Sequence, residues 1–335
     1  MAEPSFLLVR LGSLGDILHT LPSAAALRDT FPAARIDWAV EPRWVRLLSG
    51  NPDINGVISA NRTSLGGLIG TLETIRATRY TCAVDFQALY KSALLAWASR
   101  APRRIGFKSS YAREGLASLL YTDRVNPRGP HKVDHNLTLV EAVGARRGNK
   151  PRFPLSVGGQ DRETVAREIA RASLPEFFVL NPGGGWVSKC WPPERYGQLH
   201  SKLVSRFGWR GVVTFGPSER GIAQRVLESA GQPAPIALPV ALGPLMALLE
   251  RAKFVVSADT GPLHLASALG APVVGLYGPT DPSRNGPFSR ADIVVRNPQA
   301  AVTTYRREAS YSPSMLSISV EQVVQACERR LGLSA

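Results

Sequence analysis

Short apolar segments that alternate with longer helical segments constrain the fold of this chain more than any other feature of its sequence. In the first half, the apolar segments are rich in branched and aromatic residues and lie at 6–9, 36–40 and 83–86. Segments with the periodicity of a helix lie at 18–30, 64–77 and 90–99. Strands that alternate with helices in this way predict a parallel sheet that is covered by helices on both faces.

The alternation stops at 145–160, a basic segment rich in Pro and Gly, and then starts again. The second set of predicted strands lies at 177–180, 211–215, 254–257 and 273–277. The second set of predicted helices lies at 193–207, 219–230, 244–251, 262–269 and 320–331. Since 335 residues suffice for two domains, we predict an α/β protein with two doubly wound domains, 1–155 and 156–335, and a cleft between them. The last helix is a candidate to pack back on the first domain.

The net charge and the cysteines narrow the choice of partner and compartment. The formal charge is +14 at pH 7, and most of the excess lies in residues 1–155. A positive field of this size favours nucleic acid, acidic lipid or a phosphorylated substrate without choosing among them. Three widely spaced cysteines make neither a disulfide framework nor a zinc motif, so we expect a reducing compartment. No segment is typical of a membrane span or of a secretory signal.

Ligands of doubly wound sheets bind beyond the carboxyl ends of the strands, so we searched the residues that follow each predicted strand. The first motif, Arg-Leu-Gly-Ser-Leu-Gly-Asp-Ile-Leu-His at 10–19, follows the first strand and opens a helix. Gly12 and Gly15 permit a tight turn and a close approach of a ligand. Asp16 either caps the helix or acts as a general base at the mouth of a cleft. The glycine spacing differs from the dinucleotide fingerprint, which disfavours a nicotinamide cofactor.

The second motif, at 180–194, contains three consecutive glycines at 183–185 and then Ser188 and Lys189. Bare backbone N–H groups beside a cation suit a phosphate group. The alternative is a flexible loop with a surface lysine. The spacing is not that of a nucleotide-hydrolysing P-loop.

The third motif, Ser-Ala-Asp-Thr-Gly-Pro-Leu-His at 257–264, runs from a strand into a helix with a proline in its first turn. The free N–H groups of that turn and the Thr260 hydroxyl predict a phosphate site. The alternative is that Asp259 caps the helix and His264 lies in the core.

The fourth feature is the basic segment 100–132, which has a net charge of +6. It is either a solvated face, or a surface for an anionic acceptor or an anionic membrane. The sequence lacks Asp-x-Asp and lacks His, Asp and Glu clusters with metal-ligand spacing, so we do not expect a metal to hold a diphosphate. Lys189, backbone amides and a helix N-terminus would have to meet that charge instead.

The chain resembles glycosyltransferase family 9, and within it the type I lipopolysaccharide heptosyltransferases. The resemblance extends over most of the chain and is strongest at 15–22, 85–92, 112–118, 189–192 and 259–264. It implies a GT-B fold, in which two Rossmann-like doubly wound domains face a cleft. It also implies an inverting transfer of heptose, without a metal, from ADP-L-glycero-D-manno-heptose to a Kdo residue of Kdo2-lipid A.

The resemblance also assigns candidate residues. Asp16 would be the catalytic base, and Lys189 would contact the donor diphosphate. The donor would be bound by residues of the second domain, namely Gly184, Gly185, Ser188, Lys189, Glu219, Asp259, Thr260, Gly261, Leu263 and His264. The acceptor would be bound by residues of the first domain, namely Ser13, Gly15, Arg62, Gln87, Lys91 and Arg113.

The implied partners are the nucleotide-sugar donor, an anionic glycolipid acceptor and the inner-membrane surface, with no nucleic acid. The implied location is cytoplasmic, peripheral on the cytoplasmic face of the inner membrane. Three alternatives stay open at this point. They are a family 9 transferase with another donor or acceptor, an NAD(P)-dependent oxidoreductase on the same halves, and a non-enzymatic basic adaptor.

Overall fold

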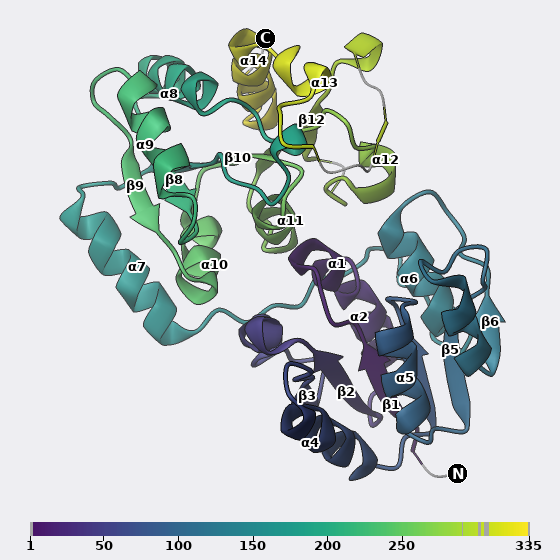
Figure 1. Ribbon diagram of the computed structural model, residues 1–335. Helices are drawn as coiled ribbons and strands as arrows, with labels where there is room; N and C mark the ends of the chain where they lie inside the picture. The colour runs from purple at the N-terminus through teal and green to yellow at the C-terminus, as the bar shows by residue number, and fades with distance from the viewer. Residues whose placement is uncertain (1–2, 290, 301–302, 305–307, 334–335) are drawn as a thin grey trace. The chain divides into compact units, whose positions relative to one another are not determined.

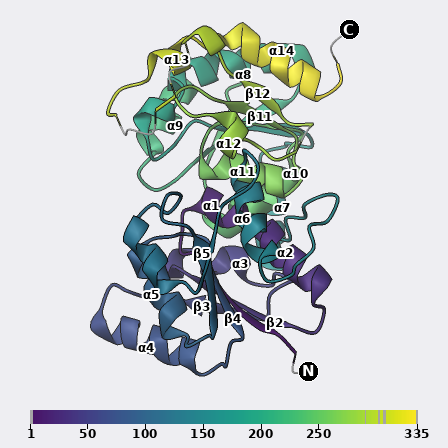
Figure 2. The same ribbon diagram turned by 90° about the vertical axis from the view of Figure 1, so that its right-hand side faces the viewer.

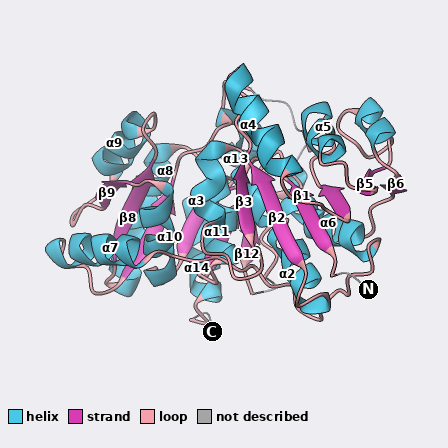
Figure 3. Ribbon diagram, turned by 90° about the horizontal axis from the view of Figure 1, so that it is seen from below, coloured by secondary structure: helices cyan, strands magenta, loops and turns pink. Residues whose placement is uncertain are grey.

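Parallel strands pair in two separate six-stranded sheets, one in each half of the chain. The structure is a computed structural model that describes residues 3–289, 291–300, 303–304 and 308–333. The chain divides into two compact units, Met1–Ser156 and Val157–Ala335. Figure 1 shows the chain path of each unit, and Figure 3 shows the strands of each sheet as a layer between helices. The α/β prediction with two doubly wound sheets is therefore confirmed.

The first sheet has the strand order β3-β2-β1-β4-β5-β6. Its strands are β1 Ser5–Val9, β2 Arg35–Val40, β3 Gly56–Ser59, β4 Cys82–Asp85, β5 Arg103–Phe107 and β6 Asp123–Val125. Its α-helices are α1 Leu14–Leu18, α2 Leu21–Thr30, α3 Val45–Leu48, α4 Leu65–Arg76, α5 Tyr90–Ala98 and α6 Lys132–Glu141. Two short 3-10 helices complete the unit, η1 Pro42–Trp44 and η2 Gly115–Leu120.

Alternate residues of the central strands bury their side chains on opposite faces of this sheet. Leu7 and Val9 pack with Ile75 of α4 and Leu95 of α5. Figure 3 shows α4 and α5 on one face of the strands and α2 and α6 on the other. Since both faces are covered, the central strands read as nearly continuous apolar runs.

The second sheet has the order β12-β11-β10-β7-β8-β9, which repeats the topology of the first sheet. Its strands are β7 Phe177–Asn181, β8 Arg210–Phe215, β9 Ile236–Pro239, β10 Val255–Ala258, β11 Val273–Leu276 and β12 Ile293–Val295. Its longer helices are α7 Gly159–Arg171, α8 Pro193–Phe207, α9 Arg220–Ser229, α10 Leu242–Arg251, α11 Gly261–Ala268 and α14 Val320–Arg330. Its short helices are η3 Val187–Lys189, α12 Pro282–Asn285, η4 Pro298–Ala300 and α13 Pro313–Leu316.

The core of the second unit lies between its sheet and helices α8, α9 and α14. Phe178, Val256 and Val274 of the sheet pack with Leu199 of α8 and Val323 of α14. The last helix contacts α8, β11 and β12 of its own unit. Within the residues that the structure describes, no helix is long and apolar enough to cross a membrane.

The structure differs from the sequence prediction in one helix and in the outer strands. The predicted helix 18–30 begins only at Leu21, as α2, and a separate helix, α1, ends at Leu18. The break lies there because Pro22 lacks an N–H and its ring would clash with the carbonyl four residues earlier. Strands β3, β5, β6, β9 and β12 lie toward the edges of the sheets and were not predicted. Helices α3, α6 and α7 were also missed, and α7 begins inside the segment 145–160 that we interpreted as a linker.

Candidate functional site

In each sheet, the order in which successive strands are added reverses beside the first strand, and the motifs predicted from the sequence lie at these two positions. In each sheet the first strand of the unit lies between its second and fourth strands, the order 3-2-1-4-5-6 of dinucleotide-binding folds. Val9, at the end of β1, pairs with Asp85 at the end of β4. Val255 of β10 pairs with Val179 of β7 in the second sheet. The loops after β1 and β4, and those after β7 and β10, therefore form the two switch points where ligands of such sheets bind.

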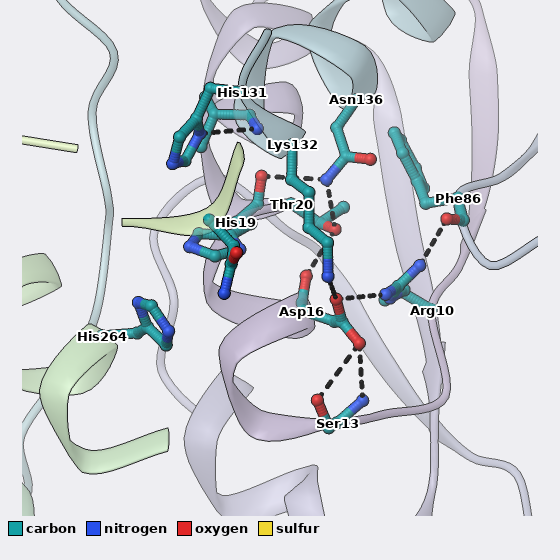
Figure 4. Close-up of polar contacts among 12 residues, drawn as sticks. Arg10, Ser13, Asp16, His19, Thr20, Phe86, His131, Lys132, Asn136 and His264 are labelled. Atoms are coloured by element: carbon teal, nitrogen blue, oxygen red, sulfur yellow. Dashed lines mark hydrogen bonds and ion pairs between the residues drawn. The ribbon is translucent and has the colours of Figure 1, made fainter. Parts of the chain in front are cut away.

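Asp16 is held at the first switch point by contacts to both of its carboxylate oxygens (Figure 4). Its Oδ1 atom lies 2.8 Å from Nη2 of Arg10 and 3.0 Å from Nζ of Lys132. Its Oδ2 atom accepts hydrogen bonds from Oγ and the backbone N–H of Ser13, the N-cap of α1, at 3.1 and 3.4 Å. Asp16 therefore contributes to the capping of α1, but it also pairs with two cations, which capping does not require.

The two cations decide the ionisation of Asp16. Burial alone would raise the pKa of the carboxyl group, but the charges of Arg10 and Lys132 outweigh burial and hold the pKa well below its usual value. Asp16 is therefore ionised at neutral pH. A carboxylate with a low pKa is a weak base for as long as both cations stay on it.

Arg10 and Lys132 differ in how firmly they are held. The Arg10 side chain is only 11% exposed, and its guanidinium also donates to the backbone carbonyl of Phe86. The Lys132 side chain is 38% exposed and stands at the first turn of α6. Figure 4 shows both cations converging on Asp16. The rings of His19 and His131 lie nearby, edge to face, with their centroids 5.2 Å apart. Sequence analysis missed both partners, although Arg10 precedes the glycine turn and Lys132 ends the basic segment.

Glu41 is a further residue that sequence analysis missed. It accepts hydrogen bonds from Arg62 at 3.0 Å and lies 4.0 Å from Nζ of Lys91. A Cβ atom on Gly12 would lie 3.5 Å from a carboxylate oxygen of Glu41. Two of the predicted acceptor residues, Arg62 and Lys91, are thus brought together beside the glycine turn.

The other predicted acceptor residues have different surroundings. Gln87 is buried, and its Oε1 accepts the backbone N–H of Leu11 at 2.8 Å, so it supports the loop that carries Asp16. Gly15 lies within α1, and Ser13 contacts Asp16 directly. Arg113 is exposed on the segment before η2.

Asp259 organises the second switch point. Its carboxylate accepts hydrogen bonds from Nζ of Lys189 at 2.7 Å, Oγ1 of Thr280 at 2.8 Å and Nδ2 of Asn285 at 3.1 Å. It also lies 3.1 Å from Nε2 of His264. Burial would raise the pKa of Asp259, but His264 and Lys189 together lower it below its usual value.

These contacts exclude one part of the alternative for the third motif and agree with the other part. The N-cap of α11 is Thr260, and the Asp259 carboxylate is taken up by the contacts just described, so the prediction of Asp259 as a cap is wrong. His264 is buried against Asp259. Asp259 thereby acts as a positioning group for Lys189. Thr280 and Asn285, which complete this network, carried no signal in the sequence.

Two of the three glycines are packed and Lys189 is mostly buried, so the alternative of a surface lysine is wrong. A Cβ atom on Gly183 would lie 2.3 Å from the Glu219 carboxylate, and one on Gly184 would lie 2.8 Å from Cγ2 of Thr260. Glu219 in turn accepts the backbone N–H of Gly216 at 2.8 Å. Lys189 is mostly buried, with its Nζ 4.5 Å from the centre of the Trp186 ring.

The remaining donor candidates differ in how accessible they are to a ligand. Leu263 is fully buried, so the structure exposes neither its side chain nor its backbone to a ligand. Ser188 is buried, whereas a Cβ atom on Gly185 would meet nothing within 4 Å. Gly261 opens α11 ahead of a proline. Among the described residues, no group of three or more His, Cys, Asp or Glu side chains could hold a metal ion.

Two Rossmann-like sheets, each with charged groups at its switch point, are the parts of a GT-B glycosyltransferase. The profile of glycosyltransferase family 9 (heptosyltransferase) matches residues 71–314, and the chain belongs to this family. It is 31% identical to lipopolysaccharide heptosyltransferase 1 of Pseudomonas aeruginosa over 92% of this chain and 88% of that protein. The alternatives of an oxidoreductase and of a non-enzymatic adaptor are therefore wrong.

Solved structures agree with this assignment. A family 9 glycosyl transferase from Veillonella parvula superposes with a TM-score of 0.86 at 24% identity, covering 100% of this chain and 99% of that one. The Escherichia coli heptosyltransferase WaaC with ADP superposes with a TM-score of 0.79 at 27% identity, covering 97% and 99%. The resemblance predicted from the sequence motifs is confirmed at the level of family, fold and enzyme class.

Proposed function

We propose that this enzyme moves heptose from ADP-L-glycero-D-manno-heptose to a Kdo residue of Kdo2-lipid A, with inversion and without a metal. The relative named lipopolysaccharide heptosyltransferase 1 and the similar structure with ADP support this choice of acceptor pathway and nucleotide. The His-Thr-Leu-Pro sequence at 19–22 favours the type I reaction. The unit Met1–Ser156 would take the acceptor, and the unit Val157–Ala335 would take the donor.

The observation that carries the proposal is the ionised carboxylate of Asp16 at the first switch point. In the proposed reaction, Asp16 accepts the proton of an acceptor hydroxyl, whose oxygen forms a bond to the anomeric carbon. The bond from that carbon to the nucleotide diphosphate breaks on the opposite face. General-base help of this kind contributes about 10²–10⁴-fold to the rate.

Lys189 and the first turn of α11 would stabilise the departing diphosphate. The Lys189 ammonium has three N–H groups, and Asp259 accepts one of them. The backbone N–H group of Gly261 lies in the first turn of α11, where Pro262 contributes none. Loss of one such donor costs about 10²–10³-fold in turnover.

An anionic acceptor would also increase the basicity of Asp16. Kdo carries a carboxylate, which can compete with Asp16 for the exposed ammonium of Lys132. Arg10 cannot leave in the same way, because it is buried and bound to the Phe86 carbonyl. Arg62, Lys91 and Arg113 would supply further positive charge to the acceptor. Binding of the acceptor would thus withdraw one cation from the base and leave the other to orient it.

A melting-temperature screen with ADP-, GDP- and UDP-linked sugars tests the donor, because a ligand that binds the folded state stabilises it. At 100 times its Kd, the donor should add about 2.7 kcal/mol to the free energy of unfolding. We expect ADP-heptose to raise the melting temperature and to release ADP only when Kdo2-lipid A is added. Stabilisation by a GDP- or UDP-sugar, with no turnover of ADP-heptose, would contradict the proposal. We place the enzyme on the cytoplasmic face of the inner membrane, without a nucleic-acid partner.

A further inference from the structure

Large apolar side chains are exposed on one part of the first unit. Of the eleven that are exposed among the described residues, eight lie between residues 65 and 119. They are Leu65 and Ile69 of α4, Tyr90, Leu94 and Trp97 of α5, Tyr111, and Leu116 and Leu119 of η2. Three of these leucines are more than 60% exposed. Isolated exposed leucines are ordinary, but a concentration of this kind marks an interaction surface.

These side chains belong to elements that contact one another. Tyr90, Leu94 and Trp97 are four and three residues apart, so they share one side of α5. Helix α5 packs against α4 on one side and against η2 on the other. Figure 2 shows α4 and α5 as neighbours at the periphery of the unit. We call this surface the α4–α5–η2 face.

The same face is rich in positive charge. Residues 62–124 contain ten Lys or Arg and four Asp or Glu. Of the four acidic groups, Asp85 is buried, Asp123 pairs with Arg103, and Glu114 accepts the backbone N–H of Tyr90. The fourth, Glu73 of α4, is exposed. The exposed cations without an ion-pair partner among the described residues include Arg100, Lys108 and Arg113.

Not all arginines of the basic segment contribute to this charge. Arg104 donates to the carbonyls of Ala101 and Leu120, and Arg124 donates to the carbonyl of Ser118. These two side chains hold the loops around β5 and η2 in place. The cations available to a partner are therefore the exposed ones named above, Arg100, Lys108 and Arg113, which lie close in the chain to the exposed apolar residues.

We propose that the α4–α5–η2 face binds the surface of an anionic phospholipid bilayer. Leucines and a tryptophan would enter the boundary between headgroups and acyl chains, and the flanking cations would meet the lipid phosphates. Each basic residue near such a surface adds about fivefold to the binding constant. The charge around the apolar side chains is mostly positive, which suits the phosphates of an anionic bilayer.

The preference for a bilayer rests in part on the proposed function, whose acceptor is anchored in a membrane. Lys91 lies on α5, and Arg113 precedes η2, so proposed acceptor residues belong to the same elements as the face. Binding of this face to the bilayer would hold the acceptor residues next to the lipid headgroups.

Flotation with vesicles that contain no acceptor tests the proposal separately from catalysis. The full-length protein should float with vesicles of phosphatidylcholine and phosphatidylglycerol at 70:30, and binding should fall with salt. The double variants Leu94→Ser/Trp97→Ser and Leu116→Ser/Leu119→Ser should each bind at least tenfold more weakly. The matched control changes Leu316→Ser and Leu333→Ser, which are 42% and 54% exposed in the second unit, and it should bind like the wild type.

A charge variant and a soluble acceptor complete the test. Arg100→Gln/Lys108→Gln should weaken binding to the anionic vesicles and leave the residual binding to pure phosphatidylcholine unchanged. All face variants should keep wild-type turnover with a lipid-free Kdo acceptor, which also shows that they are folded.

Two results would overturn the proposal. One is wild-type protein that does not float with the anionic vesicles. The other is wild-type protein that dimerises through this face, so that the Leu94 and Trp97 variant becomes monomeric but still binds vesicles. If ADP-heptose is not a substrate but flotation follows the predicted pattern, the proposed function fails and the membrane surface stands.

Discussion

Replacing Asp16 by asparagine tests the assignment of the base most directly, because a second aspartate in the same unit provides a close control. The Asp16 side chain is 16% exposed and lies 2.8 Å from Nη2 of Arg10. The Asp134 side chain is 18% exposed and lies 2.8 Å from Nη1 of Arg147. Asp16→Asn and Asp134→Asn therefore each remove an arginine pair of the same length from an aspartate of similar exposure. They differ in that Asp16 also pairs with Lys132, that Arg10 is more buried than Arg147, which is 37% exposed, and that only Asp16 lies at the switch point.

The two variants should differ in turnover far more than in stability. Each variant loses ion pairing that is partly open to solvent. We therefore expect the free energy of unfolding to fall by about 1–2 kcal/mol, between the values for surface pairs and buried pairs. Loss of a general base should reduce the turnover of Asp16→Asn about 10²–10⁴-fold, which corresponds to about 3–5 kcal/mol of activation free energy. Asp134→Asn should keep turnover within about twofold of the wild type.

The assay follows ADP release with saturating donor and acceptor, together with urea unfolding of each variant and calorimetric titration with ADP. Donor affinity should be unchanged in Asp16→Asn, because the proposed donor residues belong to the other unit. Retention of more than a tenth of wild-type turnover by Asp16→Asn would refute its role as the base. An equal loss in Asp134→Asn would show that the effect is structural.

Three further results are expected. Lys132→Met should move the acid limb of the kcat/KM profile to higher pH, because removal of this cation lets the pKa of Asp16 rise; an unchanged limb would contradict the pairing. Asp259→Asn should lower the free energy of unfolding by about 2–4 kcal/mol at pH 7. Since the folded-state pKa of Asp259 is lowered, this difference should be full above about pH 4 and shrink as the pH falls further; denaturant titrations at pH 7 and pH 3 measure it. Burial raises the pKa of Cys82 to about 12 and that of Cys190 to about 11, so a thiol reagent at pH 8 should label the protein only after denaturation, when all three cysteines react.

The fold could be predicted from the sequence where residues are buried on both sides and not at the edges of the sheets. Strands β1, β4, β7 and β10 lie at the centre, and their apolar runs were recognised within a few residues. Next to an edge, β5 begins with Arg103 and Arg104, which hide its short apolar end. At an edge, β9 has only three apolar residues before Pro239, and prolines precede it as well, so the segment resembles a loop. Edge strands are half-exposed, and their identity depends on the neighbouring strand rather than on their own composition.

In the candidate site, too, the residues of local motifs could be predicted from the sequence, whereas their partners from distant segments could not. Asp16, Lys189 and the segment 259–264 stood out because each follows a strand within a few residues. Arg10 stands six residues before Asp16, but Lys132 comes from an element 116 residues away. Thr280 and Asn285 approach Asp259 from 21 and 26 residues along the chain. Glu41 and Lys132 have no local pattern, so only the folded structure identifies them as partners.

Each unit compensates the charge of its candidate residue with side chains of opposite charge. Asp16 is compensated by Arg10 and Lys132, and Lys189 is compensated by Asp259. A catalyst gains rate only from interactions that are stronger in the transition state than in the ground state. In the proposed reaction, Asp259 already holds Lys189, so the lysine would attract a resting diphosphate less than a free cation would. Its remaining N–H groups would gain most when the leaving group develops charge. On the same reasoning, the acceptor removes Lys132 from Asp16 only when it is bound, so the strongest base would form when there is a hydroxyl to deprotonate.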